Sequence, residues 1–408
     1  MKPLREAQGE VIAGVHQLGT ERVRVEEALH RVLAEPAVAS GPIPPFPNSA
    51  MDGFAVRQSD VASTPVTLLV NEDVPAGSVP TLAVGPGTAT RIMTGAPMPD
   101  GADCVVPVED TESGTGDSVT IVSGGPIGAN VRPAGGDIGI GDVVVDAGTR
   151  LSARHLGSLA SVGVSPVVYR QPVVALMSTG DEVVEYTTEE LGPGKIRDTN
   201  RAVLRGVLDS LHIPYVDMGI VGDEIEDLRE AYLAAADVGD AIISTGGVSM
   251  GDFDFVKQIL RESGSVDFWK VAMQPGKPFA FGHVDGVPLF GLPGNPVSTF
   301  VSFEQFVRPA LLAMMGATKL FRPRVPGVIG EDVTTNDEKD VFVRVMLAPD
   351  TDGSFVALAA GGQGSNILSA LANADAFAVV PVGVGSLSAG DPVTLEMFTW
   401  DENRGFDG

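Results

Sequence analysis

The sequence predicts a multidomain protein of the α/β plus β class that contains a doubly wound parallel sheet. Strand and helix patterns alternate from residue 172 to about residue 315, as in an open parallel sheet covered by helices on both faces. On both sides of this region, short apolar runs separated by Gly, Pro and Asp indicate small all-β domains. The chain has 408 residues, which is enough for several domains that each bury a core.

The N-terminal region, up to about residue 40, has the spacing of amphipathic helices. Two apolar faces are expected, one formed by Leu4, Val11, Ile12 and Val15 and the other by Ala28, Leu29, Val32 and Leu33. Helix formation should stop in the proline-rich run 41–47, because proline lacks an N–H donor and restricts the residue before it.

Short β runs then extend to about residue 150 and predict a small all-β domain. They are Val66–Val70, Thr88–Met93, Cys104–Val108 and Val119–Val122.

The α/β region begins with Pro172–Met177, a nearly continuous apolar run that suits a strand covered on both faces. Helices are expected after Asn200 and after Asp223, and Asp223 is a candidate N-cap because Glu226 follows three residues later. The remaining elements are strands at Ile213–Met218, Ala241–Ser244 and Val287–Phe290 and a helix at Val297–Met315.

The last 90 or so residues return to short strands, which predict a small β barrel or sandwich. These strands are Pro326–Ile329, Val341–Leu347, Phe355–Ala359, Ala376–Val380 and Pro392–Phe398.

The composition limits the partners. The net charge of −26 should repel nucleic acid and anionic lipid, so an anion can bind only in a local cationic pocket. The chain has only seven lysines, and three of them (Lys257, Lys270 and Lys277) lie in one short stretch. The single cysteine, Cys104, is expected to be a small buried side chain, and the five scattered histidines do not have the spacing of a zinc site. No leader or membrane-spanning run is apparent, so we expect a cytoplasmic protein.

Three glycine-rich loops should meet at one edge of the sheet, because the carboxyl ends of parallel strands point the same way. They are Ser178–Glu182, Ser244–Asp254 and Gly291–Ser298. Glycines allow a ligand to approach the backbone, and a helix N-terminus favours an anion. A single such loop is equally well explained as an ordinary turn, whereas three at one edge favour a binding site.

Charged side chains in these loops predict a magnesium and phosphate site. Glu182 and Asp254 lie beside the turns, and Mg²⁺ is typically held by one or two carboxylates and by phosphate oxygens. For Asp223, a role as a helix cap explains the sequence as well as a role in this site does. Lys270 and Lys277 are candidate oxyanion contacts. The alternative is that each is a solvated lysine on a strand edge without a ligand. Arg344 interrupts an apolar strand and could merely point to solvent.

Several distinctive motifs follow one another along the chain: Asn48–Val56, Arg91–Pro97, Gly135–Ile138, Ser178–Glu182, Asp198–Asn200, Gly246–Gly251, Pro275–Pro278 and Gly291–Ser298. In this order they resemble the motifs of the molybdopterin molybdotransferase family, which includes the C-terminal domain of gephyrin. The resemblance covers nearly the whole chain. It implies an elongated homodimer whose subunits have four parts: an elongated helical part (1–46 with 140–171), an inserted β domain (47–139), an α/β domain (172–320) and a C-terminal β barrel (321–408).

The resemblance also implies a reaction, in which molybdate enters adenylated molybdopterin and AMP leaves, with Mg²⁺ required. It implies that Glu182 and Asp254 manage Mg²⁺, that Asp52, Asp137 and Asp223 are further acids needed for turnover, and that Lys270 lies near the phosphates. Asp52 and Asp137 would act across the dimer interface. The implied pterin and adenylate contacts are Thr179, Gly180, Gly246, Gly247, Ser249, Pro293, Gly294 and Asn295. The implied molybdate contacts are Lys277, Ser298, Arg344 and Ser365.

One position departs from the family pattern. The family often has a basic residue where this chain has Gln274, so we expect the molybdate pocket to lack one positive charge there.

Three alternatives remain open. An enzyme that adenylates molybdopterin would share the α/β domain, but the flanking β domains argue against it. A non-catalytic scaffold would not need the acids and lysines that this chain retains. A paralogue that handles tungstate has no distinguishing sequence feature. The enzyme that adenylates molybdopterin is a candidate partner.

Overall fold

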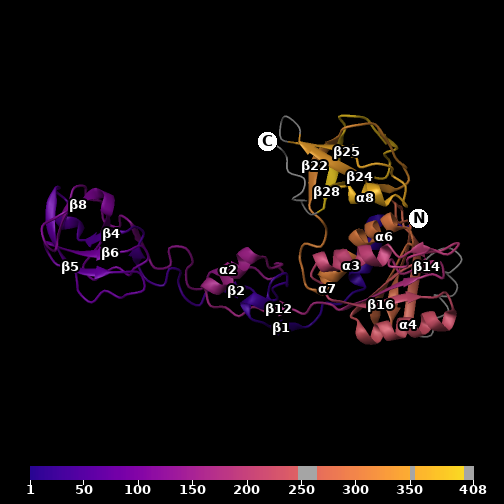
Figure 1. Cartoon of the computed structure of the whole chain (residues 1–408), viewed down its shortest axis with the longest axis horizontal. Coiled ribbons are helices and arrows are strands. Elements are labelled where there is room, and N and C mark those ends of the chain that lie inside the picture. The colour runs from indigo at the N-terminus through magenta and orange to yellow at the C-terminus, as the bar shows by residue number, and fades with distance from the viewer. Residues whose placement is uncertain (247–263, 350–353, 399–408) are drawn as a thin grey trace.

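The computed structural model describes residues 1–246, 264–349 and 354–398 and shows an elongated molecule (Figure 1). A six-stranded β sheet lies at one end, a small unit with β1, β2, β12 and α2 lies in the middle, and an α/β domain and a barrel lie together at the other end. The α/β plus β class predicted from the sequence is therefore confirmed.

The α/β domain is built on a six-stranded sheet with the strand order β16-β13-β17-β21-β20-β18. Its strands are β13 (Val174–Thr179), β16 (Tyr215–Val221), β17 (Ala241–Thr245), β18 (Gly264–Lys270), β20 (Pro278–Val284) and β21 (Val287–Leu292). The first four strands in this order are parallel.

Our prediction of a wholly parallel sheet is wrong at one side, because β20 and β18 are antiparallel. A two-residue turn, Asp285-Gly286, joins β20 to β21, and both residues have positive φ (46° and 82°). Asp-Gly is a favoured sequence for such a hairpin turn.

Helices cover both faces of the sheet, as a doubly wound fold requires. Val174 and Leu176 of β13 face a core shared with α3 and the last helical run, whereas Ala175 and Met177 face a core shared with α4. The helices are α3 (Asn200–Ser210), α4 (Ile225–Val238), α6 (Pro296–Ser302), the π-helical turn η4 (Phe303–Val307) and α7 (Arg308–Met314).

The predicted second N-terminal helix is absent. Helix α1 spans Leu4–Ala13, and its buried Leu4, Ala7 and Val11 join the α/β core. The residues after it form β1 (Thr20–Arg22), the 3₁₀ turn η1 (Val25–Glu27) and β2 (Ala37–Val38).

Long-range pairing explains this error. Strand β1 pairs with β12 (Val167–Tyr169), and β2 pairs with β11 (Val143–Val145), which lies just before α2 (Ala153–Ser161). The buried Val32 and Leu33 form bridges to distant residues, and His30 has a left-handed backbone (φ 64°) that a helix cannot contain. The apolar side chains of Val32 and Leu33 are therefore buried by residues that are distant in the sequence, and not by packing of a local helix.

The distant six-stranded sheet has the order β7-β4-β6-β5-β9-β8. Its strands are β4 (Gly53–Val56), β5 (Val66–Val74), β6 (Thr88–Ile92), β7 (Cys104–Pro107), β8 (Thr111–Ser113) and β9 (Ser118–Ile121), with the 3₁₀ turns η2 (Gln58–Asp60) and η3 (Val108–Asp110) and the small pair β3 (Asn48–Ser49) and β10 (Val131–Arg132) beside them. Cys104 is fully buried here, as predicted, and burial raises the pKa of its thiol to about 12.

The C-terminal region is a closed five-stranded barrel, which confirms the barrel prediction. Its strands pair in the cycle β24-β25-β22-β28-β26-β24. They are β22 (Arg324–Ile329), β24 (Asp340–Pro349), β25 (Phe355–Ala359), β26 (Ala376–Val380) and β28 (Pro392–Met397). The short elements are β14 (Val183–Val184), β15 (Ile196–Arg197), β19 (Met273–Gln274), β23 (Val333–Thr334), β27 (Ser386–Leu387) and α8 (Leu368–Ala372).

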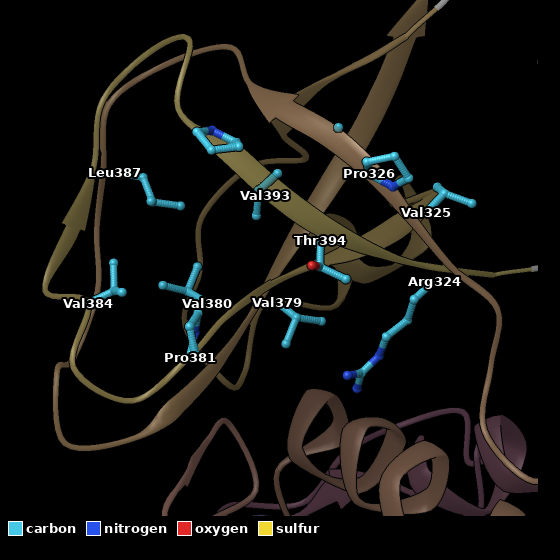
Figure 2. Close-up of a pocket in the computed structure, with 12 residues that line it drawn as sticks. Arg324, Val325, Pro326, Val379, Val380, Pro381, Val384, Leu387, Val393 and Thr394 are labelled. Carbon is cyan, nitrogen blue, oxygen red and sulfur yellow. The ribbon is translucent and has the colours of Figure 1, made fainter.

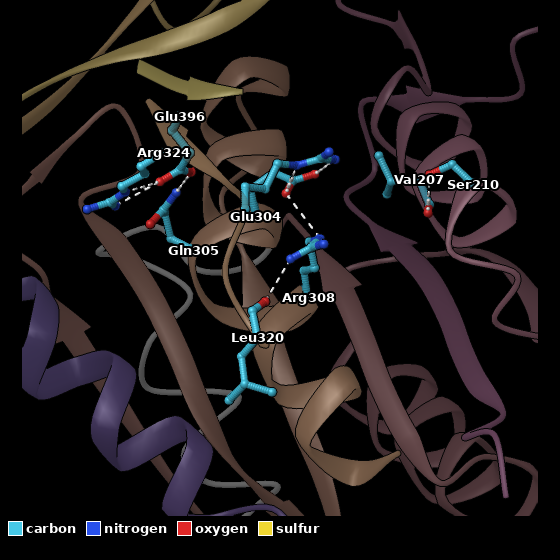
Figure 3. Close-up of polar contacts among 9 residues, drawn as sticks. Val207, Ser210, Glu304, Gln305, Arg308, Leu320, Arg324 and Glu396 are labelled. Atoms are coloured by element: carbon cyan, nitrogen blue, oxygen red, sulfur yellow. Dashed lines mark hydrogen bonds and ion pairs between the residues drawn. The ribbon is translucent and has the colours of Figure 1, made fainter. Parts of the chain in front are cut away.

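Two contacts fix the barrel on the α/β domain. Strand β19 adds to β24 in parallel. The second contact is a set of polar residues around the buried Glu304, Gln305 and Glu396, which we call the barrel joint (Figure 3). Its members are Glu304, Gln305, Arg308, Arg322, Arg324 and Glu396.

Among the described residues, no helix has the length and apolar character needed to cross a membrane.

Candidate functional site

The carboxyl ends of β13, β16, β17 and β21 meet at one edge of the sheet. In the parallel register, Thr179 lies opposite Val221, and Thr245 lies opposite Leu292. Thr179, Gly180, Gly246, Pro293, Gly294 and Asn295 therefore belong to neighbouring loops at this edge. Gly247, Ser249 and Asp254 lie outside the described residues.

The backbone at this edge is tightly packed. Gly246 has φ 95°, and a Cβ added there would lie 2.2 Å from the carbonyl oxygen of Thr179. Only glycine fits this position, since any side chain would force the loops after β13 and β17 apart.

Asn200, the first residue of α3, ties two of these loops together. Its buried side-chain amide donates to the Thr245 hydroxyl and to the Gly294 carbonyl, both at 2.8 Å. The Thr245 hydroxyl in turn donates to the Pro293 carbonyl at 3.1 Å. We did not predict this role from the sequence, although Asn200 ends the motif Asp198–Asn200.

Asp223 is not the N-cap of α4, and our alternative interpretation of it as a helix cap is wrong. The helix begins at Ile225 after Glu224, without a side-chain cap. The Asp223 carboxylate instead accepts a hydrogen bond from the Asp181 N–H (3.1 Å). The Asp181 carboxylate in turn accepts one from the Asp223 N–H (3.2 Å). The pair links the loops that follow β13 and β16.

Glu182 is exposed at the same edge, and its carboxylate makes no hydrogen bond or ion pair within the described ranges. Lys195 donates to the Asp181 carbonyl at 2.5 Å and adds a cation that we did not predict. Within the described ranges, no three acidic, histidine or cysteine side chains converge as a metal site. A magnesium ion that is held mainly by substrate phosphates needs only one or two carboxylates, and Glu182 fits that requirement.

A second cluster of predicted residues lies where the barrel meets the α/β domain. Gly276, in the turn between Lys270 and Pro278, packs against α6, because a Cβ there would lie 2.8 Å from the Ser302 hydroxyl and 3.6 Å from the Ser298 carbonyl. Ser298 is buried, whereas Lys270 and Lys277 are exposed.

Ser365 comes from a barrel loop and contacts the start of α6. Its hydroxyl accepts a hydrogen bond from the Asn295 side-chain amide at 3.2 Å, and its carbonyl accepts one from the Val297 N–H at 3.2 Å. These contacts place the barrel loop against the last of the three glycine-rich loops.

Arg344 is fully buried, so the interpretation of it as a solvent-facing residue is wrong. Phe342, on the same side of β24, belongs to the core shared with the α/β domain, so Arg344 also points toward that domain. Its guanidinium donates to the carbonyls of Gly362 (3.1 Å) and Gly364 (3.3 Å), and its Nε has no hydrogen-bond partner.

No carboxylate lies within ion-pairing distance of Arg344 in the part of the chain that the structure describes. Burial lowers the pKa of its guanidinium, but an arginine remains charged in proteins. A buried charge without a counter-charge is costly, so the position favours an anionic ligand.

A pocket of 230 Å³ adjoins Arg344. Its lining includes Gln274 and Pro275 of the α/β domain and Thr334, Val341 and Gln363 of the barrel. The Gln363 side chain pairs with the Arg344 backbone at both its N–H (2.9 Å) and its carbonyl (3.1 Å). We did not predict this role of Gln363, because its partner is 19 residues away in the sequence and no local sequence pattern indicates the contact.

A larger pocket, of 580 Å³, lies on the barrel and contains none of the predicted site residues (Figure 2). Its lining is mostly apolar and includes Val325, Val380, Leu387 and Val393, with Arg324 at one side. Among the described residues that line it, Arg324 is the only charged one, and its guanidinium is already paired with Glu396.

Asp52 and Asp137 are not close to either cluster. Both are exposed. Asp52 directly precedes β4 of the distant β sheet, which lies at the other end of the molecule from α4 and β16 (Figure 1). Asp137 lies in the connection from that sheet to the middle unit, where its N–H donates to the Ile43 carbonyl at 3.0 Å. The Thr94 N–H and hydroxyl both donate to Asp52 at 2.7 Å and lower the pKa of its carboxyl group.

Three family models match consecutive parts of the chain. The MoeA N-terminal region (domain I and II) matches residues 2–163, a probable molybdopterin-binding domain matches 175–313, and the MoeA C-terminal region (domain IV) matches 326–398.

Curated relatives and solved structures agree with these matches. The molybdopterin molybdenumtransferase of Haemophilus influenzae is 38% identical over 93% of this chain and 94% of its own length. Molybdopterin molybdenumtransferase 2 of Mycobacterium tuberculosis is 36% identical over 98% of this chain and 100% of its own. A crystal structure of the molybdopterin biosynthesis MoeA protein from Pyrococcus horikoshii matches with a TM-score of 0.83 at 29% identity, covering 98% of this chain and 100% of that one.

Proposed function

Because this chain belongs to the molybdopterin molybdenumtransferase (MoeA) family, we propose that it inserts molybdate into adenylated molybdopterin and releases AMP in a Mg²⁺-dependent reaction. The family membership agrees with the resemblance seen in the sequence motifs.

The observation that carries the proposal is the fully buried Arg344 beside a 230 Å³ pocket. An oxyanion such as molybdate supplies the negative charge that this guanidinium lacks among the described side chains. Arginine presents several N–H donors in a plane and suits an oxyanion better than a single point charge does.

Three further residues surround the same region and are proposed as molybdate contacts. Ser298 and Ser365 lie on segments that contact each other through Val297, and Lys277 lies one residue from Gly276, which packs on the same helix. Hydroxyl groups and an ammonium group donate hydrogen bonds to oxyanion oxygens.

The sheet edge is the proposed site of the pterin and its adenylate. Thr179, Gly180, Gly246, Pro293, Gly294 and Asn295 lie in its loops, and Gly247 and Ser249 continue one of them in the sequence. Asn295 is also the N-cap residue of α6, and the positive end of a helix dipole favours a phosphate. Since Asn295 contacts Ser365, the pterin end of this site adjoins the proposed molybdate pocket.

Glu182 and Asp254 are proposed to hold Mg²⁺, with Asp223 close to Glu182 and Lys270 near the phosphates. When bound, Mg²⁺ neutralises charge on the phosphoryl oxygens of the departing AMP. Glu182 can contribute because its carboxylate is exposed and makes no other contact within the described ranges.

A homodimer is proposed because Asp52 directly precedes β4 of the distant β sheet and Asp137 lies in the segment that leads from it, whereas Glu182 follows β13 of the α/β domain. The distant sheet lies at the other end of the molecule from the α/β domain (Figure 1). A second copy would bring its distant β sheet to the loops of the first, so that these acids act across the interface. Dimers of identical chains are the commonest protein assembly.

The test of the reaction uses purified protein, adenylated molybdopterin, Mg²⁺ and molybdate, and follows AMP release. We expect AMP release that depends on molybdate and Mg²⁺ and that yields active cofactor. Absence of release with molybdate and with tungstate would contradict the proposal. Formation of adenylated product from ATP and molybdopterin would point to an adenylating enzyme.

The test of the dimer combines two inactive variants, Asp52→Asn and Glu182→Gln, by co-expression. If each site takes one acid from each chain, mixed dimers keep one intact site and about a quarter of the wild-type rate returns. If both acids act within one chain, no activity returns.

A further inference from the structure

A second cation, Lys339, lies next to a residue that lines the pocket beside Arg344. The Nζ atom of Lys339 lies 3.5 Å from the Oε1 atom of Gln274, which lines the pocket. This distance is at the outer limit of a hydrogen bond, so the ammonium group is near the amide without being firmly held by it.

Backbone pairing fixes this placement. Strand β19 pairs with β24 so that Met273 lies opposite Asp340 and Gln274 lies opposite Val341. The Asp340 N–H also donates to the Ala272 carbonyl at 3.0 Å. Lys339 directly precedes Asp340, and it therefore stands beside Gln274 as a consequence of the register.

The electrostatic surroundings make this lysine unusual. The chain has seven lysines and a net charge of −26, and Asp337, Glu338 and Asp340 adjoin Lys339 in sequence. Nevertheless, Lys339 makes no ion pair with any carboxylate within the described ranges. It is only partly exposed, and its ammonium group approaches a neutral amide at the pocket.

We propose that Lys339 is an oxyanion-binding residue that supplies a positive charge in addition to those of Arg344 and Lys277, and that its side chain lies beside Gln274. This inference rests on the proposed function of the pocket. It also revises our expectation that Gln274 leaves the pocket one charge short, because the barrel provides the charge from the opposite strand. The site would then take two cations, Arg344 and Lys339, from the barrel, and Lys277 and the amide of Gln274 from the α/β domain.

The two cations have different physical roles. Arg344 is buried and fixed by two carbonyls, so its guanidinium presents donors in one geometry. Lys339 is a point charge on a flexible stem at the rim, and an ammonium of this kind can follow an oxyanion into the pocket. Because Lys339 is nearer to solvent, salt should screen its contribution more than that of Arg344.

The test measures molybdate binding by isothermal titration calorimetry and the KM for molybdate in AMP release, with the full-length protein. Lys339→Met removes the charge and keeps most of the stem. We expect the Kd and the KM for molybdate to rise by about ten- to a hundredfold, since hydrogen bonds to charged groups have effects of this size. The kcat and the thermal unfolding midpoint should change little. Lys319→Met, at an exposed lysine outside the pocket lining, is the matched control and should leave all four quantities unchanged.

A rescue separates charge from structure. Gln274→Lys in the Lys339→Met background returns an ammonium to the rim from the other strand, so we expect most of the molybdate affinity to return. Lys339→Met that binds molybdate as tightly as Lys319→Met overturns the inference and leaves the proposed function standing. A wild-type protein that neither binds molybdate nor releases AMP overturns both.

Discussion

The arginines that lie where the barrel meets the α/β domain differ in what neutralises their charge. In the barrel joint, Arg322 forms a bidentate pair with Glu304 at 2.7 Å, and Arg324 pairs with Glu396 at 2.7 Å (Figure 3). A short distance along the barrel, Arg344 has only carbonyl partners among the described residues.

In the barrel joint, each of the two buried carboxylates has two side-chain partners. Glu304 is 2% exposed and also lies 3.8 Å from Arg308, while Glu396 accepts a further hydrogen bond from Gln305 at 2.5 Å. Burial lowers the pKa of Arg322 and pairing with Glu304 raises it, and the net direction is upward. The π-helical turn η4 contributes both Glu304 and Gln305, so the irregular turn of the helix aims two polar side chains at the barrel.

The difference indicates that arginines at this domain contact have two roles, one in stability and one in ligand binding. Paired arginines hold the barrel in place, because each buried charge is matched by the protein itself. Arg344 has no carboxylate partner among the described residues, so a bound anion would neutralise its charge. Substitutions in the two sets should therefore affect different measurements.

The largest effect is expected from Glu304→Ala. It leaves Arg308 and Arg322 buried without their carboxylate, and breaking a buried pair in this way costs about 3–5 kcal/mol. We expect a loss of that order in the free energy of unfolding, measured by chemical denaturation. Glu26→Ala, which removes the exposed partner of Arg24, is the control and should have no measurable effect. Equal stability of the two variants would mean that the joint does not hold the barrel.

The next effect separates the two sets of arginines. Arg344→Met should leave the free energy of unfolding unchanged or slightly higher, because it removes an uncompensated buried charge. It should also lower kcat/KM for molybdate in AMP release by at least about tenfold. Arg324→Met is the matched control, with the opposite expectation of lower stability and retained activity. If Arg344→Met is less stable than Arg324→Met, the distinction between holding and binding arginines fails.

A smaller effect is expected from Asn200→Ala at the sheet edge. Loss of two hydrogen bonds should loosen the loops that carry Thr245 and Gly294, and we expect the KM for adenylated molybdopterin to rise by about tenfold. The Kd for molybdate should not change. Asn71→Ala is the control, because Asn71 also donates its amide to a carbonyl (Ala83, 3.0 Å), but in the distant β sheet. A KM that rises equally in both variants would show a general loss of stability instead of a positioning role.

The features that the sequence predicts well are those set by local pattern. The continuous apolar run at the first α/β strand corresponds to β13, whose six residues are all buried. The alternation of strands and helices places three glycine-rich loops at one edge, because parallel strands leave no other arrangement. The five short strands at the C-terminus also lie close to the positions predicted from their spacing.

The features that the sequence does not predict depend on contacts between distant residues. Val32 and Leu33 have helical spacing but form isolated bridges with residues more than a hundred positions away. Asp223 has the local signature of a cap, yet its carboxylate bonds to the neighbouring loop. Asn200 and Lys339 matter through partners brought close by the sheet and by the β19–β24 pairing, and no local pattern contains that information.

The smallest effect concerns the contact between the middle unit and the α/β domain. The rings of His30 and His212 stack with centroids 3.6 Å apart, and Arg150 donates to the carbonyls of His30 and Leu211. Burial, and then the charges of His212 and Arg150, lower the pKa of His30 below its ordinary value of 6.5. The unfolded chain therefore takes up this proton first as the pH falls, so His30 destabilises the fold progressively below about pH 6.5 and has no effect well above that value.

We expect His30→Asn to lessen the fall in thermal unfolding midpoint between about pH 7.5 and pH 5.5, since Asn accepts the left-handed backbone at this position but does not titrate. His16→Asn, at an exposed histidine outside this contact, should keep the wild-type slope. Equal slopes for the two variants would exclude His30 as the source of the pH dependence. A selective change would show that the middle unit, unlike the barrel, meets the α/β domain through a contact that protonation weakens.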